Sequence, residues 1–156
     1  MGMEAYAKNL AALVELLPQK PPFRFVDEIL EASPTALRAA YRFREDEYFY
    51  QGHFPGNPVT PGVILVEAMA QAGLSALALF RLLDQGEDIS RVSGMPMLFT
   101  LADAVEFTGV VRPGERVVTQ AELVHFRKKN MRSAVAMTRE NGEPVARGVL
   151  SGTGAW

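Results

Sequence analysis

The sequence predicts an α+β domain in which an antiparallel β-sheet wraps one long, apolar helix. Residues 61–83 are almost wholly apolar and rich in alanine, which is typical of a helix enclosed by protein on most sides. After residue 92 the pattern changes to strands joined by tight turns, which favours an antiparallel sheet. The chain has 156 residues, of which 48% are hydrophobic and 22% charged, as expected for one globular domain spanning residues 1–156.

Three elements are expected before the long helix. Residues 4–16 have apolar side chains at helical spacing, and the proline-rich residues 17–22 end that helix. Residues 23–32 are typical of a strand. Residues 37–44 alternate as a second strand, with one face formed by Leu37, Ala39, Tyr41 and Phe43.

The long helix has a clear start and end in the sequence. Thr60 is a plausible N-cap, and Pro61 fits the first helical position, where its missing N–H costs nothing. Helical character runs to about Leu83, and residues 84–86 end it. The run is long enough to span a bilayer, but Glu67 and the neighbouring polar residues on the helix indicate a buried helix instead.

The rest of the chain predicts strands over residues 92–107, with an interruption at Pro96, and over 116–127, 131–139 and 144–152. Asn141-Gly142 between the last two is a strong hairpin signal. A single sheet around one helix leaves strand edges and one side of the helix uncovered. A symmetric dimer would cover them.

Composition excludes several classes of function. The net charge of −2 argues against a general nucleic-acid binder, which would normally be basic. The absence of cysteine excludes disulfides, thiolate metal sites and a cysteine nucleophile. With two histidines and no HExxH spacing, the sequence also argues against metal-dependent hydrolysis.

His53 and Glu67 are the candidate acid–base residues. His53 stands in a proline-rich loop, and Glu67 lies on the apolar helix in one polar stripe with Gln71 and Ser75. Burial is expected to raise the pKa of Glu67, which suits a general acid, whereas a neutral histidine can act as a base. Gln71, one turn after Glu67, could orient its carboxyl group or a water molecule.

The start of the helix adds hydrogen-bond donors. The N–H groups of Gly62 and Val63 have no partner inside the helix, and glycine allows a ligand to approach closely. Such donors suit a carbonyl oxygen that gains charge, although the Thr60 hydroxyl could instead cap one of them. A base, an acid and these donors together fit removal of a proton next to a carbonyl and loss of water by β-elimination.

Simpler interpretations stay open for each residue. His53 could be an ordinary polar loop residue, and Glu67 could be a satisfied core residue or part of an interface salt bridge. Ser75 fits a small packing residue. His125, in an alternating strand, fits a structural or surface residue.

The segment from His53 to Gly73 (HFPGNPVTPGVILVEAMAQAG) closely resembles the signature of the bacterial 3-hydroxyacyl-[acyl-carrier-protein] dehydratases of the FabZ type. Residues 17–27 (LPQKPPFRFVD) and 107–115 (FTGVVRPGE) are similar to two further segments of this family. The chain departs from the family at Gln19, where members often have histidine. It also departs at Glu106, where a basic residue commonly precedes the phenylalanine.

The resemblance implies a hot-dog fold and a cytoplasmic homodimer, often assembled into a trimer of dimers. It implies dehydration of a (3R)-hydroxyacyl thioester to the trans-2-enoyl thioester in fatty acid synthesis, with no metal or organic cofactor. His53 matches the catalytic histidine and Glu67 the catalytic acid, a pair that meets across the subunit interface in such dimers. Gly62 matches the residue whose amide polarises the thioester carbonyl, and Gln71 the glutamine after the acid. A glutamate at position 67 favours the plain dehydratase over the dehydratase/isomerase type.

The expected partner is an acyl carrier protein, which is acidic. A basic cluster could help dock it, together with Arg112, although a solvated turn explains the same residues: Arg127, Lys128, Lys129 and Arg132. Two other functions remain. One is a different enzyme on the same fold, a thioesterase or an enoyl hydratase acting on coenzyme A thioesters. The other is a non-catalytic subunit that binds acyl thioesters.

Overall fold

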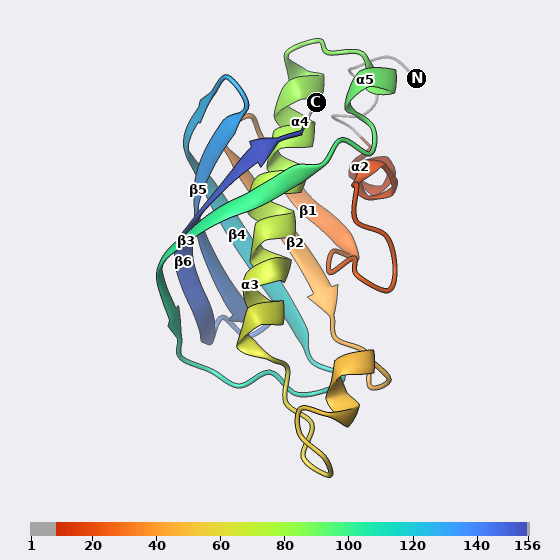
Figure 1. The fold of residues 1–156 in the computed structure, drawn as a ribbon, viewed down its shortest axis with the longest axis vertical. Coiled ribbons are helices and arrows are strands. Elements are labelled where there is room, and N and C mark those ends of the chain that lie inside the picture. The colour runs from red at the N-terminus through yellow and green to blue at the C-terminus, as the bar shows by residue number, and fades with distance from the viewer. Residues whose placement is uncertain (1–8, 156) are drawn as a thin grey trace.

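The structure is a computed structural model that describes residues 9–155. In this part of the chain, six antiparallel strands form one sheet in the order β1-β2-β4-β5-β6-β3. The sheet curves around a helical column, residues 62–84, which runs along its inner side (Figure 1). The predicted α+β class, a hot-dog arrangement of a sheet around a central helix, is confirmed.

The N-terminal elements are shorter than predicted. Helix α2 covers Leu10–Leu16, and the Asn9 side chain caps it by accepting a hydrogen bond from the Ala12 amide; residues 4–8 of the predicted helix lie outside the described residues. Strand β1 covers only Glu28–Ala32. Residues 23–25 do not join it, because the Phe23 carbonyl and the Phe25 amide hydrogen-bond to the Gln71 side chain of the central helix, and only the Asp27 amide, next to β1, donates to β2, at the Ala40 carbonyl.

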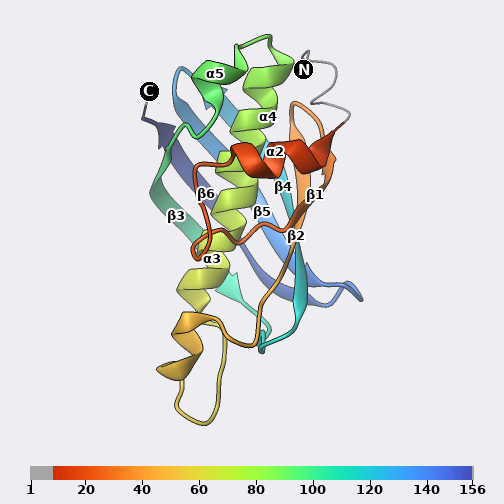
Figure 2. The ribbon, with the colours of Figure 1, turned by 90° about the vertical axis from the view of Figure 1, so that its right-hand side faces the viewer.

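Strand β2 (Ala36–Arg42) confirms the predicted alternation. The four predicted inward side chains are all buried, and Phe43, just past the end of the strand, is fully enclosed. After a 3-10 turn, η1 (Tyr48–Gln51), the chain forms a loop that projects beyond the start of the central helix (Figure 2).

The helical column consists of α3 (Gly62–Ala70), a π-helical segment η2 (Gln71–Ala76) and α4 (Leu77–Asp84). Its small residues let the sheet approach closely, as expected. A Cβ added at Gly73 would lie 2.6 Å from a methyl carbon of Val135 on β5. By length and composition the column could cross a membrane, but 83% of its most apolar stretch is buried inside the protein. It is the core helix of the domain.

The start of the column differs from the prediction. Pro61, with extended backbone angles, is the N-cap, and it makes no side-chain capping bond. Thr60 is not the cap, because its hydroxyl is hydrogen-bonded to the Tyr50 hydroxyl at 2.6 Å and its amide donates to the Val111 carbonyl. Burial raises the pKa of Tyr50 to about 12, so this phenol stays protonated and can donate to Thr60.

The remaining strands are β3 (Met97–Phe107), β4 (Arg116–Arg127), β5 (Asn130–Arg139) and β6 (Pro144–Gly154). Val92, predicted as the start of a strand, instead ends a short helix, α5 (Ile89–Val92), because Asp88 caps this turn by accepting from the Ser90 amide. The β5–β6 hairpin turns at Asn141-Gly142, as predicted, with Gly142 at a φ of +89°.

Strand β3 forms one edge of the sheet and is largely exposed. Large apolar side chains on it are between two-fifths and just over half exposed. Val63, at the start of the helix, is more exposed still (76%). The exposed apolar residues of this edge are Leu98, Phe99, Leu101 and Phe107. A long edge strand with such side chains offers unpaired main-chain groups and apolar surface to which another chain can bind.

Candidate active site

Glu67 lies on the second turn of α3 and faces the N-terminal segment of the chain. Burial raises the pKa of its carboxyl group, and the hydrogen bond from Gln71 lowers it by a smaller amount. The carboxyl therefore keeps its proton to a higher pH than an exposed glutamate does. This confirms the expectation from the apolar helix, and it suits a general acid.

Gln71 fixes the orientation of this carboxyl group. Its side chain is fully buried, its Oε1 accepts from the Phe25 amide at 2.7 Å, and its Nε2 donates to the Phe23 carbonyl at 2.9 Å. The same Nε2 donates to Glu67 Oε1 at 2.9 Å. Because Oε1 accepts this bond, the proton of a neutral Glu67 belongs on Oε2, which has no partner among residues 9–155.

His53 lies in the projecting loop, which we call the His53 loop (residues 53–59). Its Nδ1 is 2.8 Å from the Val59 carbonyl oxygen. A carbonyl only accepts, so Nδ1 carries the hydrogen, and Nε2 of the neutral ring carries the free lone pair. The ring also stacks on Phe54, with centroids 4.0 Å apart. The loop thus presents His53 in the tautomer that a general base needs.

The amides of Gly62 and Val63 are available as donors. Within the described part of the chain, neither has a hydrogen-bond partner, and the Thr60 hydroxyl, engaged with Tyr50, does not cap them. The expected competition from Thr60 is therefore wrong. The Phe107 ring packs against the same position, 3.0 Å from where a Cβ at residue 62 would lie, so any larger residue there would make the ring or the helix start shift.

The structure brings some of the predicted residues together and separates others. Glu67 and Gln71 are hydrogen-bonded, and Gly62 begins the same helix. His53 makes no hydrogen bond with Glu67 in a single chain. Its loop extends past the N-terminal end of α3 (Figure 2), whereas Glu67 is linked to the segment at Phe23 through Gln71.

Gln19 extends the polar stripe through Ser75, which the sequence did not indicate. Ser75, interpreted as a small packing residue, is buried and accepts a 3.1 Å hydrogen bond from Gln19 Nε2. The Gln19 Oε1 atom is buried without a partner among the described residues. Gln19 and Ser75 are 56 positions apart, so no local sequence pattern predicts their hydrogen bond. The only signal in the sequence is that Gln19 stands where family members often have histidine.

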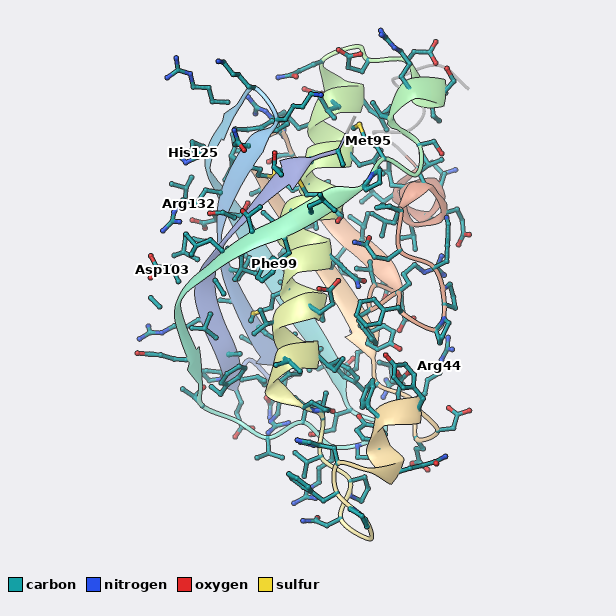
Figure 3. All side chains as sticks on the ribbon, viewed as in Figure 1. Arg44, Met95, Phe99, Asp103, His125 and Arg132 are labelled. Atoms are coloured by element: carbon teal, nitrogen blue, oxygen red, sulfur yellow. The ribbon has the colours of Figure 1, made fainter. Side chains whose placement is uncertain are left out.

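The basic residues lie at and next to one turn but differ in their contacts. Arg127, Lys128 and Lys129 are exposed at the β4–β5 turn, but Arg132 is paired with Asp103 at 3.0 Å and bonded to Ser151 (Figure 3).

Arg112, expected to act with this cluster, lies at the other end of β4, where it hydrogen-bonds to Asn57 of the His53 loop. Arg112 therefore does not lie beside the turn. His125 is exposed on β4 across from Arg132, as a surface residue (Figure 3).

Over residues 9–155 no three His, Asp or Glu side chains gather as a metal site would require. The chemistry available at Gly62, Glu67 and Gln71 is hydrogen bonding and proton transfer.

Comparisons with known proteins identify relatives over most of the chain. The FabA-like domain matches residues 17–149. A 3-hydroxyacyl-[acyl-carrier-protein] dehydratase FabZ of Caldicellulosiruptor bescii is 36% identical over 143 residues, covering 91% of this chain and 95% of the relative. The FabZ proteins of Oenococcus oeni and Thermus thermophilus are 39% and 35% identical. They cover 83% and 86% of this chain and 86% and 89% of the relatives, respectively.

Solved structures share the fold. The dehydratase heterocomplex ApeI:P from Xenorhabdus doucetiae has a TM-score of 0.77 at 16% identity and covers 92% of this chain and 91% of that one. A hypothetical thioesterase with coenzyme A from Streptococcus pneumoniae has a TM-score of 0.54 at 11% identity, over 82% and 84% of the two chains. From the domain match and the identity over most of its length, the chain belongs to the FabA-like family and, within it, to the FabZ-type dehydratases.

Proposed function

We propose that this protein is a hydro-lyase that converts a (3R)-hydroxyacyl thioester on acyl carrier protein to the trans-2-enoyl thioester in fatty acid biosynthesis. The relatives that match most of this chain are named for this activity. The single observation that supports it most is the half-buried Glu67 carboxyl group. Its partial burial raises its pKa, and Gln71 donates a hydrogen bond to its Oε1. A protonated, oriented carboxyl group is what the departure of a hydroxyl group requires.

The proposed reaction uses three groups of the chain. His53 Nε2 takes the proton from the carbon next to the thioester carbonyl, and the electron pair forms the new C=C bond. The Gly62 amide, beside that of Val63, donates to the thioester oxygen while it carries negative charge. The hydroxyl group leaves as water with the proton from Glu67 Oε2. A proton returned from His53 to Glu67 through solvent resets the site. No metal or organic cofactor takes part.

We propose that the working site is shared between two subunits of a homodimer. Supporting this, His53 and Glu67 make no hydrogen bond with each other within one chain, and the exposed apolar edge strand β3 offers a surface that could pair with its own copy. Phe107 on that edge already packs against Gly62, so a partner on β3 would lie beside the start of the helix. We extend the proposal to a trimer of dimers, which size-exclusion chromatography with light scattering tests.

The substrate carrier and the compartment belong to the same proposal. An acidic carrier protein would dock at the exposed β4–β5 turn through Arg127, Lys128 and Lys129. Arg132 lies next to them but is already paired with Asp103, so its role in docking is the smaller one. The buried core helix and the dehydratase relatives support a cytoplasmic enzyme.

The direct test is an absorbance assay for the conjugated enoyl thioester, run with 3-hydroxyacyl carriers of several chain lengths. The proposal predicts enoyl formation without release of free thiol. Release of thiol from an acyl thioester would instead identify a thioesterase, and faster turnover of coenzyme A thioesters would identify an enoyl hydratase. Tight acyl binding with no turnover of any substrate would identify a non-catalytic binding subunit.

A further inference from the structure

Two hydrogen bonds join the His53 loop to residues 110–115, a segment far from it in sequence. The Thr60 amide, just after the loop, donates to the Val111 carbonyl at 2.9 Å. The Arg112 guanidinium donates from Nη1 to Asn57 Oδ1 at 3.3 Å. The loop is therefore held at its end and near its middle by neighbouring residues of one segment.

Asn57 is coupled to His53 through the main chain of the loop. The Asn57 and Phe54 main chains exchange two hydrogen bonds, of 2.9 and 3.0 Å, and Phe54 directly follows His53. The Val59 amide also donates to the His53 carbonyl at 2.9 Å, which joins the two ends of the His53 loop. Residues 54–57 are exposed, so few packing contacts fix them. Asn57 is therefore linked to His53 through the loop main chain, while the His53 amide itself donates to the Phe49 carbonyl at 3.1 Å.

Arg112 is itself fixed from behind. Its amide donates to Glu115 Oε2 at 2.6 Å, and Arg139 Nη1 on β5 donates to Glu115 Oε1 at 2.7 Å. Arg139 Nη2 also donates to the Val110 carbonyl at 2.6 Å. One arginine on the rigid sheet thus holds both sides of the segment that carries Arg112.

From this geometry we infer that Arg112 is a positioning residue that orients His53 through Asn57, with Arg139 and Glu115 as its support. The inference rests on the proposed function, in which His53 is the base. It gives Arg112 a different role from carrier docking, because the side chain is directed at the loop of its own chain and lies at the opposite end of β4 from Lys128.

The kinetic test compares Asn57→Ala, Arg112→Ala and the double variant. Each single change removes the same hydrogen bond, so each lowers kcat by about two- to fivefold with little change in KM, since the contact is exposed. The double variant is no worse than either single one. Asn57→Asp keeps an acceptor for Arg112 and retains wild-type kcat. Arg38→Ala, which removes an exposed ion pair with Glu31 at the far edge of the sheet, is the matched control.

The outcomes separate this inference from docking and from the proposed function. A docking role for Arg112 would raise KM for the carrier-bound substrate only and leave Asn57→Ala unaffected, which would overturn the inference. Multiplicative losses in the double variant would also overturn it. Hydrogen exchange at the Phe54 and Val59 amides can be measured whether or not the protein is an enzyme. It should become faster in both single variants if the Arg112–Asn57 hydrogen bond fixes the loop. Unchanged exchange in the variants would overturn the inference that Arg112 holds the loop. Faster exchange in the variants, combined with no dehydration by the wild-type protein, would overturn only the proposed function.

Discussion

Gln71 Nε2 lies 2.9 Å from Glu67 Oε1 and thereby determines which carboxyl oxygen is left for chemistry. The amide cannot rotate to reverse this, because its oxygen already accepts from the Phe25 amide and its nitrogen also donates to the Phe23 carbonyl. The N-terminal segment, which was expected to be a strand, therefore serves to lock the orientation of the acid. The following predictions depend on this arrangement.

Replacing Gln71 with Met should affect both stability and the pH dependence of turnover. The buried Phe25 amide loses its acceptor, which costs about 1–3 kcal/mol of unfolding free energy. The hydrogen bond from Gln71 lowers the pKa of Glu67, so its loss raises that pKa further and moves the alkaline decline of kcat to higher pH. Denaturant melts and a kcat–pH profile measure the two effects. An alkaline limb at unchanged pH would show that Glu67 is not the titrating acid.

Glu67→Gln should make the protein more stable as well as inactive. Burial raises the pKa of Glu67 above its unfolded value, so the folded state binds the proton more tightly and unfolding free energy falls as pH rises through that window. The neutral amide avoids this loss and still accepts from Gln71. The variant should therefore resist urea better than wild type at alkaline pH, with a smaller gain in acid. Glu31→Gln, at an exposed ion pair, should show no such gain.

Gly62→Ala should lower kcat about tenfold, because the new Cβ would lie 3.0 Å from the Phe107 ring and displace either the ring or the donor amide. Phe107→Leu in the same chain makes room and should restore part of the activity. Gly52→Ala is the matched control, since a Cβ there meets no atom within 4 Å. Full activity in Gly62→Ala would contradict the proposed use of this amide.

Charge reversal at the β4–β5 turn should impair carrier docking and nothing else. Lys128→Glu with Lys129→Glu should raise KM for carrier-bound substrate roughly three- to tenfold, and added salt should reduce the difference. A small thioester analogue makes no contact with this turn and should be turned over as by wild type. Equal effects on both substrates would count against docking there.

Elements with a local pattern could be predicted from the sequence, whereas those decided by distant contacts could not. The alternating pattern of residues 116–127 predicted both ends of β4. The spacing of Glu67 and Gln71 on one helix predicted that their side chains would meet. Residues 23–25 look like the start of a strand, but their main chain hydrogen-bonds to Gln71, 46 positions after Phe25. Thr60 looks like an N-cap, but Tyr50 takes its hydroxyl.

The support of the His53 loop lies furthest from what a sequence shows. Arg112 is 55 residues from Asn57, and its charge alone suggested a role in docking. Only the fold of the sheet places it beside the loop. The tautomer of His53 likewise depends on the direction of the Val59 carbonyl, which the loop geometry determines.

The most direct measurement of the central claim, an acid–base site shared between subunits, uses two inactive variants. His53→Ala and Glu67→Gln should each lose at least about a hundredfold in kcat, as expected for removal of a general base or acid. Co-expressed with different tags and purified as the heterodimer, they form one site with both groups intact and one with neither. The account predicts about half of the wild-type dehydration rate for this heterodimer. A heterodimer no more active than the two inactive homodimers would contradict it.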